Sequence, residues 1–196
     1  MERPFTLFLF FLLSVQTILH AQKTNEGVYL SSDDFHHGKV SHAKEKGKKY
    51  KFYLHEAFNS STIKIIRGDS IIKLNKDSIF GYTDNENISY RFYNRAAYQI
   101  INPTEKILLY SQASVGGYKE SQTVIKYFFS INANSPLYSL SKWNLKKSFP
   151  ADPVFHELLD IYFGYDTELL NYDSSYKIYK LNRVYQLSQQ TTIKIN

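Results

Sequence analysis

The stretch that decides the fold is residues 67–101, which read RGDSIIKLNKDSIFGYTDNENISYRFYNRAAYQII. Apolar and aromatic segments alternate here with short polar breaks, and the segments are Ile71–Leu74, Ile79–Tyr82, Ile88–Tyr93 and Tyr98–Ile101. In the third segment the even positions are Ile, Tyr and Phe, whereas the odd positions are Ser, Arg and Tyr. This period of two is the pattern of a half-buried strand. The stretch therefore predicts an antiparallel β-meander that buries one face.

Further strands are predicted on both sides of this meander. Gly68 supplies the positive φ that a hairpin turn requires, and Gly81, inside a strand pattern, indicates a bulge or a close backbone approach. The connection Gln112–Gln122 holds a Gly-Gly pair among polar residues, so it is predicted to be a long loop. The additional strands are Gly27–Leu30, Tyr50–Leu54, Thr62–Ile66, Ile107–Tyr110, Thr123–Phe129 and Pro136–Leu140.

Helix-start signals flank the strand segments. Ser31 is the predicted cap of a short helix that Gly38 ends. Ser141 is the predicted cap of a helix over residues 142–149. Asp152, followed by Pro153, starts a longer helix that ends near residue 164.

The last amphipathic pattern completes the fold class. A final helix is predicted from Asp173, with Ile178, Leu181, Val184 and Tyr185 on one face, and residues 188–196 are expected to fray. We therefore predict a single α+β domain over residues 22–196. Its antiparallel meander sheet has about seven to nine strands in the region 27–140, and C-terminal helices in the region 141–188 cover the sheet.

The first 21 residues match a secretory signal peptide. Arg3 precedes the apolar run Phe5–Val15, and a segment ending in Ala21 follows, after which cleavage is predicted. The competing interpretation is an uncleaved membrane anchor, but the apolar run falls short of the roughly 20 residues that span a bilayer. We therefore expect an exported protein without a transmembrane span in its mature form. Its expected location is the periplasm, the cell surface or the exterior.

The composition is rich in tyrosine and phenylalanine and lacks cysteine. The 196-residue chain has 17 Tyr, 14 Phe and no Cys, which favours strands and excludes disulfides, thiolate metal sites and a cysteine nucleophile. Its formal net charge is +6, and loss of residues 1–21 leaves this unchanged because Glu2 and Arg3 cancel. A basic surface favours non-specific attraction to anionic polymers or lipid head groups.

Several short segments resemble one group of known proteins. They are Gly27–Leu30 with Asp34-Phe35, Ile79–Tyr82, Tyr127–Ser130, and Leu140–Leu145 with Phe155 and Leu158-Leu159. Together they are similar to small exported proteins from Bacteroidetes, and the resemblance covers nearly all of the mature chain. It implies secretion in a bacterium with two membranes. The shared motifs are structural, and the group has no established activity.

One stretch interleaves lysines with aromatic residues. Its candidate binding residues are Lys48, Lys49, Tyr50, Lys51, Phe52 and Tyr53. Such a mixture suits a glycan or single-stranded nucleic acid. Export makes nucleic acid a poor partner and favours an anionic glycan or an envelope protein. The alternative is a solvated strand edge on which lysines discourage aggregation.

Motifs for catalysis and metal binding are weak. Asp34 and His37 would share a helix face, but no His-x-His or HExxH spacing supports a metal site. Ser139–Lys142 matches a bare Ser-x-x-Lys pattern without its companion motifs and is interpreted as a helix cap. Arg67–Asp69 matches an integrin-binding tripeptide, yet a turn requires Gly and Asp regardless. No catalytic residue, metal ligand or cofactor site is predicted.

These patterns predict a non-enzymatic envelope or secreted protein that binds a partner or helps to build a surface structure. The alternative is an enzyme of unrecognised type that acts on cell-wall or glycan material. A binding protein is expected to expose an aromatic patch on its sheet. An enzyme is expected to show a concave pocket with convergent ionisable groups.

The signal-peptide pattern predicts the mass of the mature protein. Removal of residues 1–21 would leave Gln22 at the amino terminus, either open or cyclised. Intact-mass spectrometry of protein recovered from the periplasm or the medium checks this expectation. Full-length chain in the membrane fraction would instead support the anchor interpretation.

Overall fold

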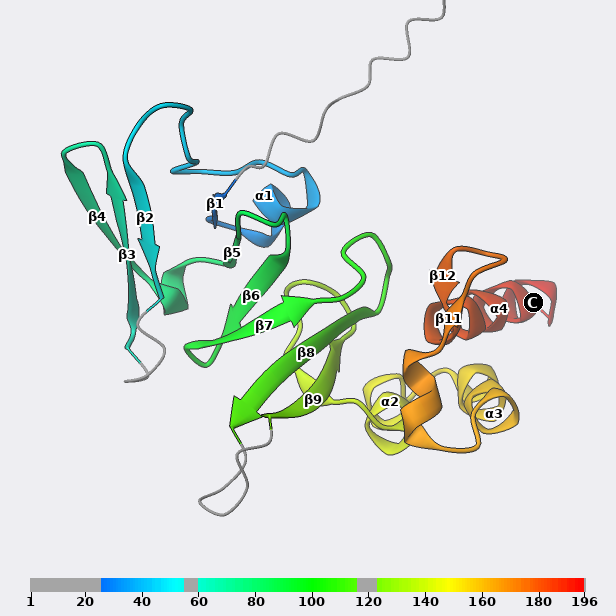
Figure 1. The fold of residues 1–196 in the computed structure, drawn as a ribbon. Helices are drawn as coiled ribbons and strands as arrows, with labels where there is room; N and C mark the ends of the chain where they lie inside the picture. Colours follow the sequence, from blue (N-terminus) through cyan, green and yellow to red (C-terminus); the bar gives the residue numbers. More distant parts are fainter. Residues whose placement is uncertain (1–25, 55–59, 116–122, 196) are drawn as a thin grey trace, which may run out of the picture.

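The chain has the α+β fold that its sequence predicts, with the helical region C-terminal to the sheet (Figure 1). The computed structural model describes residues 26–54, 60–115 and 123–195. Strands in these ranges form a seven-stranded sheet, a three-stranded sheet and a two-stranded hairpin. The predicted signal peptide, residues 1–21, lies outside the described residues.

The seven-stranded sheet is a meander with the first strand of the chain added at one edge. Hydrogen bonds join its strands in the order β1-β5-β6-β7-β8-β9-β10, and every neighbouring pair is antiparallel. The strands are β1 (Gly27–Tyr29), β5 (Gly81–Thr83), β6 (Ser89–Tyr93), β7 (Ala96–Ile100), β8 (Leu108–Val115), β9 (Thr123–Ser130) and β10 (Tyr138–Ser139).

Between β1 and β5 the chain leaves this sheet and builds a second one, here called the small sheet. Its strands are β2 (Tyr50–Tyr53), β3 (Thr62–Arg67) and β4 (Ser70–Asn75), all antiparallel. The β3–β4 hairpin turns at Gly68, where a φ of 59° confirms the predicted turn.

One detail of the predicted meander is wrong. Ile71–Leu74 lies in the small sheet and not beside Ile79–Tyr82, because the 3-10 helix η2 (Lys76–Ser78) redirects the chain between them. Asn75 starts this turn by accepting a hydrogen bond from a backbone N–H two residues later. The predicted close approach at Gly81 is confirmed, since a Cβ there would lie 1.9 Å from a backbone oxygen of β6.

The predicted helix starts at Ser141 and Asp152 are both confirmed. Ser141 caps α2 (Lys142–Ser148), and Asp152 caps α3 (Pro153–Tyr162), each by accepting a backbone N–H from the first helical turn. Proline occupies the start of α3, where its missing N–H costs nothing.

The final helix begins later than predicted. The prediction that a helix starts at Asp173 is wrong, because Asp173 ends the strand β11 (Tyr172–Asp173). This strand pairs with β12 (Ile178–Tyr179). The Asp173 carboxylate accepts two backbone N–H groups from the residues that follow, which bends the chain into a turn. The 3-10 helix η3 (Asp166–Leu170) precedes this hairpin, and α4 (Lys180–Ile195) follows it. Residues 188–195, expected to fray, are therefore helical.

Strand register divides the seven-stranded sheet into two faces. Side chains at paired positions share a face, and neighbours along one strand lie on opposite faces. One face, here called the groove face, contains the cross-strand partners Tyr82, Tyr90, Gln99, Ser111 and Tyr127. The other is here called the Arg91 face.

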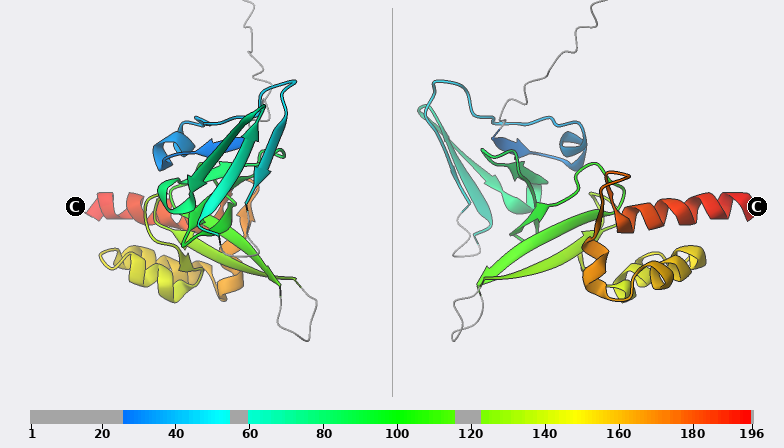
Figure 2. Two further views of the ribbon diagram at one scale, coloured as in Figure 1. Left: turned by 90° about the vertical axis from the view of Figure 1, so that its left-hand side faces the viewer. Right: turned by 45° about the vertical axis from the view of Figure 1, so that its right-hand side comes forward.

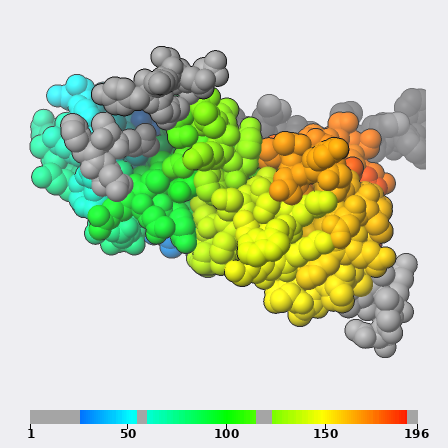
Figure 3. Space-filling view, turned by 90° about the horizontal axis from the view of Figure 1, so that it is seen from below, coloured from blue at the N-terminus to red at the C-terminus, as the bar shows by residue number. Residues whose placement is uncertain are grey.

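The groove face has two separate covers, at opposite ends of the sheet (Figure 2, Figure 3). At one end the small sheet packs the fully buried Ile63 and Ile65 against Phe92. At the other end the helical region packs against Leu109 and Phe129, which are also fully buried. The predicted cover by C-terminal helices is thus confirmed, and the small sheet is an additional cover.

The Arg91 face is also covered, so the prediction of a single buried face is wrong for β6. The side chain of Arg91 is buried at 6% exposure. Its guanidinium donates to the Tyr110 hydroxyl at 3.2 Å and to the Ser135 carbonyl at 2.9 Å. It also lies 5.6 Å from the ring of Phe80, on which Phe35 of α1 (Ser32–His36) stacks.

Two buried asparagines join the helical region to the start of β8. Asn182 of α4 accepts the N–H of Ile107 and donates to its carbonyl, both at 2.8 Å. Asn102 donates to the same carbonyl at 2.8 Å and accepts the N–H of Leu109 at 2.6 Å. Backbone groups that would otherwise be buried without partners are thereby satisfied.

The connection between β8 and β9 is shorter than predicted. Residues 112–115 belong to β8 and pair with residues 123–126 of β9. The rest of the predicted loop, residues 116–122, lies outside the described residues.

Leu159 and Ile161 of α3 make a matched pair for testing the helical cover. Leu159 is fully buried in the core under the helices, whereas Ile161 is 66% exposed. Leu159→Ala is expected to lower the free energy of unfolding by about 2–5 kcal/mol, the range for truncating a buried leucine. Ile161→Ala is expected to change it by about 0.5 kcal/mol at most. Urea denaturation measures both, and equal effects would contradict the packing described.

Candidate functional site

Two adjoining hollows lie on the groove face, between the small sheet and the helical region. The larger has a volume of about 510 Å³ and the smaller about 330 Å³. Ser111 and Ile125 line both, so the hollows form one continuous depression, here called the groove.

Strands β7, β8 and β9 supply the floor of the groove. Their register pairs Gln99 with Ser111 and Ala113 with Ile125, all on the groove face. Ser111 Oγ donates a hydrogen bond to Gln99 Oε1 at 3.4 Å. Because the side chains of Ser111 and Ala113 are short, they leave the hollow open in the region that neither the small sheet nor the helical region covers.

Tyrosines line both ends of the groove. At the end near the small sheet, Tyr82 stacks on Tyr90 with ring centroids 4.7 Å apart. At the helical end, Tyr127 and Tyr179 line the smaller hollow, and Tyr179 meets Tyr172 edge-on at 5.3 Å. Tyrosine presents an apolar ring and a polar tip, a combination common at binding surfaces.

Lys76 and Arg95 bring positive charge to the larger hollow. Asn94 and Arg95 form the β6–β7 turn with φ values of 49° and 67°, the positive pair that a type I′ hairpin requires. Arg95 Nε donates to Asp77 at 3.2 Å. Lys76 is 2% exposed, with its ammonium 5.6 Å from the ring of Phe92.

The groups that converge on the groove are therefore cationic, phenolic, hydroxyl and amide groups. Among the described residues that line it, none is a carboxylate or an imidazole. Proton transfer near neutral pH mostly uses those two groups, whereas cations, amides and tyrosine rings recognise ligands.

The structure divides the predicted binding patch between two faces of the small sheet. Tyr50 and Phe52 pack inward against the core between the two sheets. Lys51 and Tyr53, at the alternate positions, lie on the outer face. Lys48 and Lys49 precede the strand, both exposed, and Lys48 is paired with Glu45. The six residues therefore do not form one continuous surface.

The outer face of the small sheet carries a row of basic side chains. Register places Tyr53, Lys64 and Lys73 side by side across the three strands, with Lys51 on the same face. Lys64 and Lys73 are direct cross-strand partners, an unfavourable arrangement for like charges. Neither forms an ion pair with any residue that the structure describes. This face is thus a second basic surface, separate from the groove.

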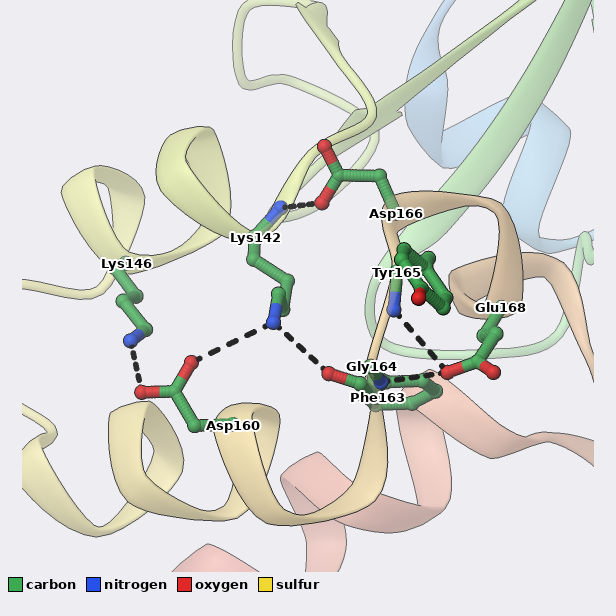
Figure 4. Close-up of polar contacts among 8 residues, drawn as sticks. All are labelled: Lys142, Lys146, Asp160, Phe163, Gly164, Tyr165, Asp166 and Glu168. Carbon is green, nitrogen blue, oxygen red and sulfur yellow. Dashed lines mark hydrogen bonds and ion pairs between the residues drawn. The ribbon is translucent and has the colours of Figure 1, made fainter.

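The Ser-x-x-Lys match at Ser139–Lys142 has a structural role. Lys142 Nζ donates to the Phe163 carbonyl at 2.9 Å and pairs with Asp160 at 3.8 Å (Figure 4). The Lys142 backbone N–H donates to Asp166, so this lysine ties α2 to the end of α3 and to η3. The interpretation as a helix cap is confirmed by Ser141.

The remaining sequence candidates lie apart from the groove. His37 contacts Asp33 on the exposed side of α1, and the described residues hold no cluster of three or more potential metal ligands. Arg67, at the start of the Arg-Gly-Asp turn, pairs with Glu45 at 3.3 Å.

No sequence motif marks the residues that line the groove. Gln99, Ser111 and Ala113 are ordinary in type, and Lys76 falls in a segment read as a polar break. The one local signal is the run of short or polar residues at alternate positions of strands that are otherwise apolar and aromatic.

Comparison of the chain with protein-family models, with curated proteins and with solved structures finds no match. In the described ranges, no helix combines the length and the apolar character needed to cross a membrane.

The Tyr50 hydroxyl is a buried polar group with no hydrogen-bond partner in the described part of the chain. Burial, with a smaller contribution from Glu26, raises its pKa, so it stays protonated. Tyr50→Phe is expected to raise the free energy of unfolding by about 1 kcal/mol, because it removes an unsatisfied hydroxyl. Urea denaturation measures the change. A loss of stability would show that the hydroxyl finds a partner in solution, and Tyr176→Phe, at a residue 62% exposed, serves as the control.

Proposed function

We propose that the protein is exported and acts without catalysis, by binding a partner in the groove. The groove carries this proposal, because a concave hollow with a few convergent polar groups is the usual form of a ligand site. Its larger part, about 510 Å³, has a volume typical of such sites. The signal-peptide pattern and the resemblance to exported Bacteroidetes proteins support a location in the cell envelope or outside the cell.

The groove lining favours a partner with apolar surface, and the basic character of the protein favours one that also carries negative charge. Tyr90 and Tyr127 are partly exposed and offer ring surface to the groove. The buried Lys76 and the Asp77-paired Arg95 line the larger hollow. The net charge of +6 adds long-range attraction for an acidic partner. An acidic segment of an envelope protein and an anionic glycan both carry such chemistry.

Filling the groove tests this function. Ala113 lies on the groove floor with an exposed side chain, so a larger residue there would occupy the hollow without disturbing the core. Two probes represent the two partner classes: oligogalacturonate, and a library of hexapeptides in which Glu alternates with apolar residues. Ala113→Trp is expected to weaken binding of the better probe by about tenfold or more, measured by calorimetric titration.

A control variant on the outer face of the small sheet tests whether binding occurs in the groove or on the second basic surface. The double variant Lys64→Gln/Lys73→Gln removes a cross-strand pair of like charges and should leave binding and folding intact. If this variant loses binding while Ala113→Trp keeps it, the outer face is the site and the groove proposal fails. Failure of both probes to bind the wild-type protein would also overturn it.

A further inference from the structure

The outer edge of β9 is open over half its length. β10 pairs with only two residues of β9, and the N–H of Leu140 then donates to the Tyr127 carbonyl at 2.9 Å. Within the described ranges, no strand lies beyond Thr123–Lys126 on that side. The opposite edge of the sheet differs, since Val28 of β1 exchanges two backbone hydrogen bonds with Ser41, at 2.9 and 2.8 Å.

Backbone groups at this open edge point outward at Thr123 and Ile125. In an antiparallel sheet the N–H and C=O of one residue point to the same side, and the side alternates along the strand. The Tyr127 carbonyl points toward β10, so Ile125 and Thr123, two and four positions earlier, point the same way. The partner that satisfies such a row of donors and acceptors is another extended backbone.

Side chains beside the open edge belong to the groove. Ile125 is 53% exposed and Tyr127 38%, and both line it. Val124, 47% exposed, and Lys126 lie on the opposite face of the strand. A strand added at this edge would therefore place every second side chain in the groove and the others beside Lys126. This half of the β8–β9 hairpin extends away from the helices (Figure 2), and its Val124 and Ile125 side chains are about half exposed.

The chemistry of the two faces specifies the added strand. Apolar side chains match the groove face, where Ile125 and the ring of Tyr127 are exposed. Acidic side chains match the other face, where Lys126 is exposed and makes no ion pair with a described residue. Alternation of acidic and apolar residues is thus the pattern that fits.

We propose that an extended peptide segment of a partner protein, with alternating acidic and apolar residues, binds by adding a strand to the open edge of β9. Its backbone pairs with Thr123 and Ile125, and its apolar side chains enter the groove. This inference rests on the proposed function and names the partner of the same site as a peptide and not a glycan.

Amide hydrogen exchange of the full chain tests the backbone pairing. The probe is the tightest binder from a positional-scanning library of acetylated hexapeptides, in which Glu or Asp alternates with Val, Ile, Leu, Phe or Tyr. Its addition is expected to slow amide exchange at Thr123 and Ile125 by about tenfold or more. The exchange rate of the Val124 amide, which is already bonded to β8, is expected to stay the same. N-methylation of the peptide amides that face β9 is expected to weaken binding by about tenfold.

Two substitutions at one position distinguish the contribution of the backbone to peptide binding from that of the side chain. Ile125→Pro removes the outward N–H, which the sheet of the protein itself does not use, and proline is tolerated at such edge positions. Ile125→Ala keeps that N–H and removes the side chain. The proline variant is expected to bind the peptide at least about fivefold more weakly than the alanine variant, with exchange at Val124 confirming that the hairpin remains folded. Lys126→Glu is expected to weaken the binding of acidic peptides and to strengthen the binding of peptides in which Lys replaces Glu or Asp.

Several results would overturn the peptide assignment. They include equal binding by the two Ile125 variants, unchanged exchange at Thr123 and Ile125, and no binding by any peptide of the library. Oligogalacturonate binding that Ala113→Trp abolishes would, in that case, leave the proposed function standing with a glycan as partner. Concentration-dependent protection of the same two amides without peptide, together with a dimer in sedimentation, would assign the edge to a second copy of the chain.

Discussion

The pair of hydrogen bonds between the Asn182 amide and the peptide groups of Ile107 is the attachment on which the groove depends. It joins residues 75 positions apart, fully inside the protein. Beside it, the N–H of Tyr179 donates to Glu105 at 3.1 Å, which fixes one wall of the smaller hollow. Burial raises the pKa of Glu105, and hydrogen bonds from its neighbours oppose this shift. Apolar contacts alone have little directionality, so these polar bonds set where the helical cover stops and the open floor begins.

Arg91 holds the same sheet from the opposite face. Its guanidinium contacts Tyr110 of β8, Ser130 of β9 and the Ser135 carbonyl, so it ties β6 to the far side of the meander. In the described part of the chain it has no carboxylate partner, and neutral oxygens and aromatic rings replace one. Burial raises the pKa of Tyr110, which keeps this phenol protonated as a hydrogen-bonding partner. The sheet that carries the groove floor is thus held by buried polar contacts on both of its faces.

Local chemistry predicted the elements better than their assembly. The caps at Ser141 and Asp152 and the glycines at positions 68 and 81 could be read from sequence, because each depends on a few neighbouring residues. The helix start predicted at Asp173 is wrong because an aspartate that accepts nearby N–H groups starts a turn as readily as a helix. The division of the strands into two sheets and the burial of Arg91 depend on pairings distant in sequence. No local pattern contains that information.

The groove could not be predicted because it is a gap between two covers and not a motif. Each cover is held in place by contacts between residues that are distant in sequence. The sequence of the floor strands therefore does not indicate where each cover ends. The open edge of β9 has the same origin, since β8 and β9 extend beyond both covers.

A hairpin that extends beyond the core gains little from burial, and an exposed apolar edge invites association. Val124, Ile125 and Tyr127 are nevertheless apolar or aromatic at this position, and Lys126 alone interrupts them. A single lysine discourages unspecific strand pairing without blocking it. An edge of this composition, beside a hollow lined by tyrosines, is better suited to accepting one defined strand than to facing water permanently.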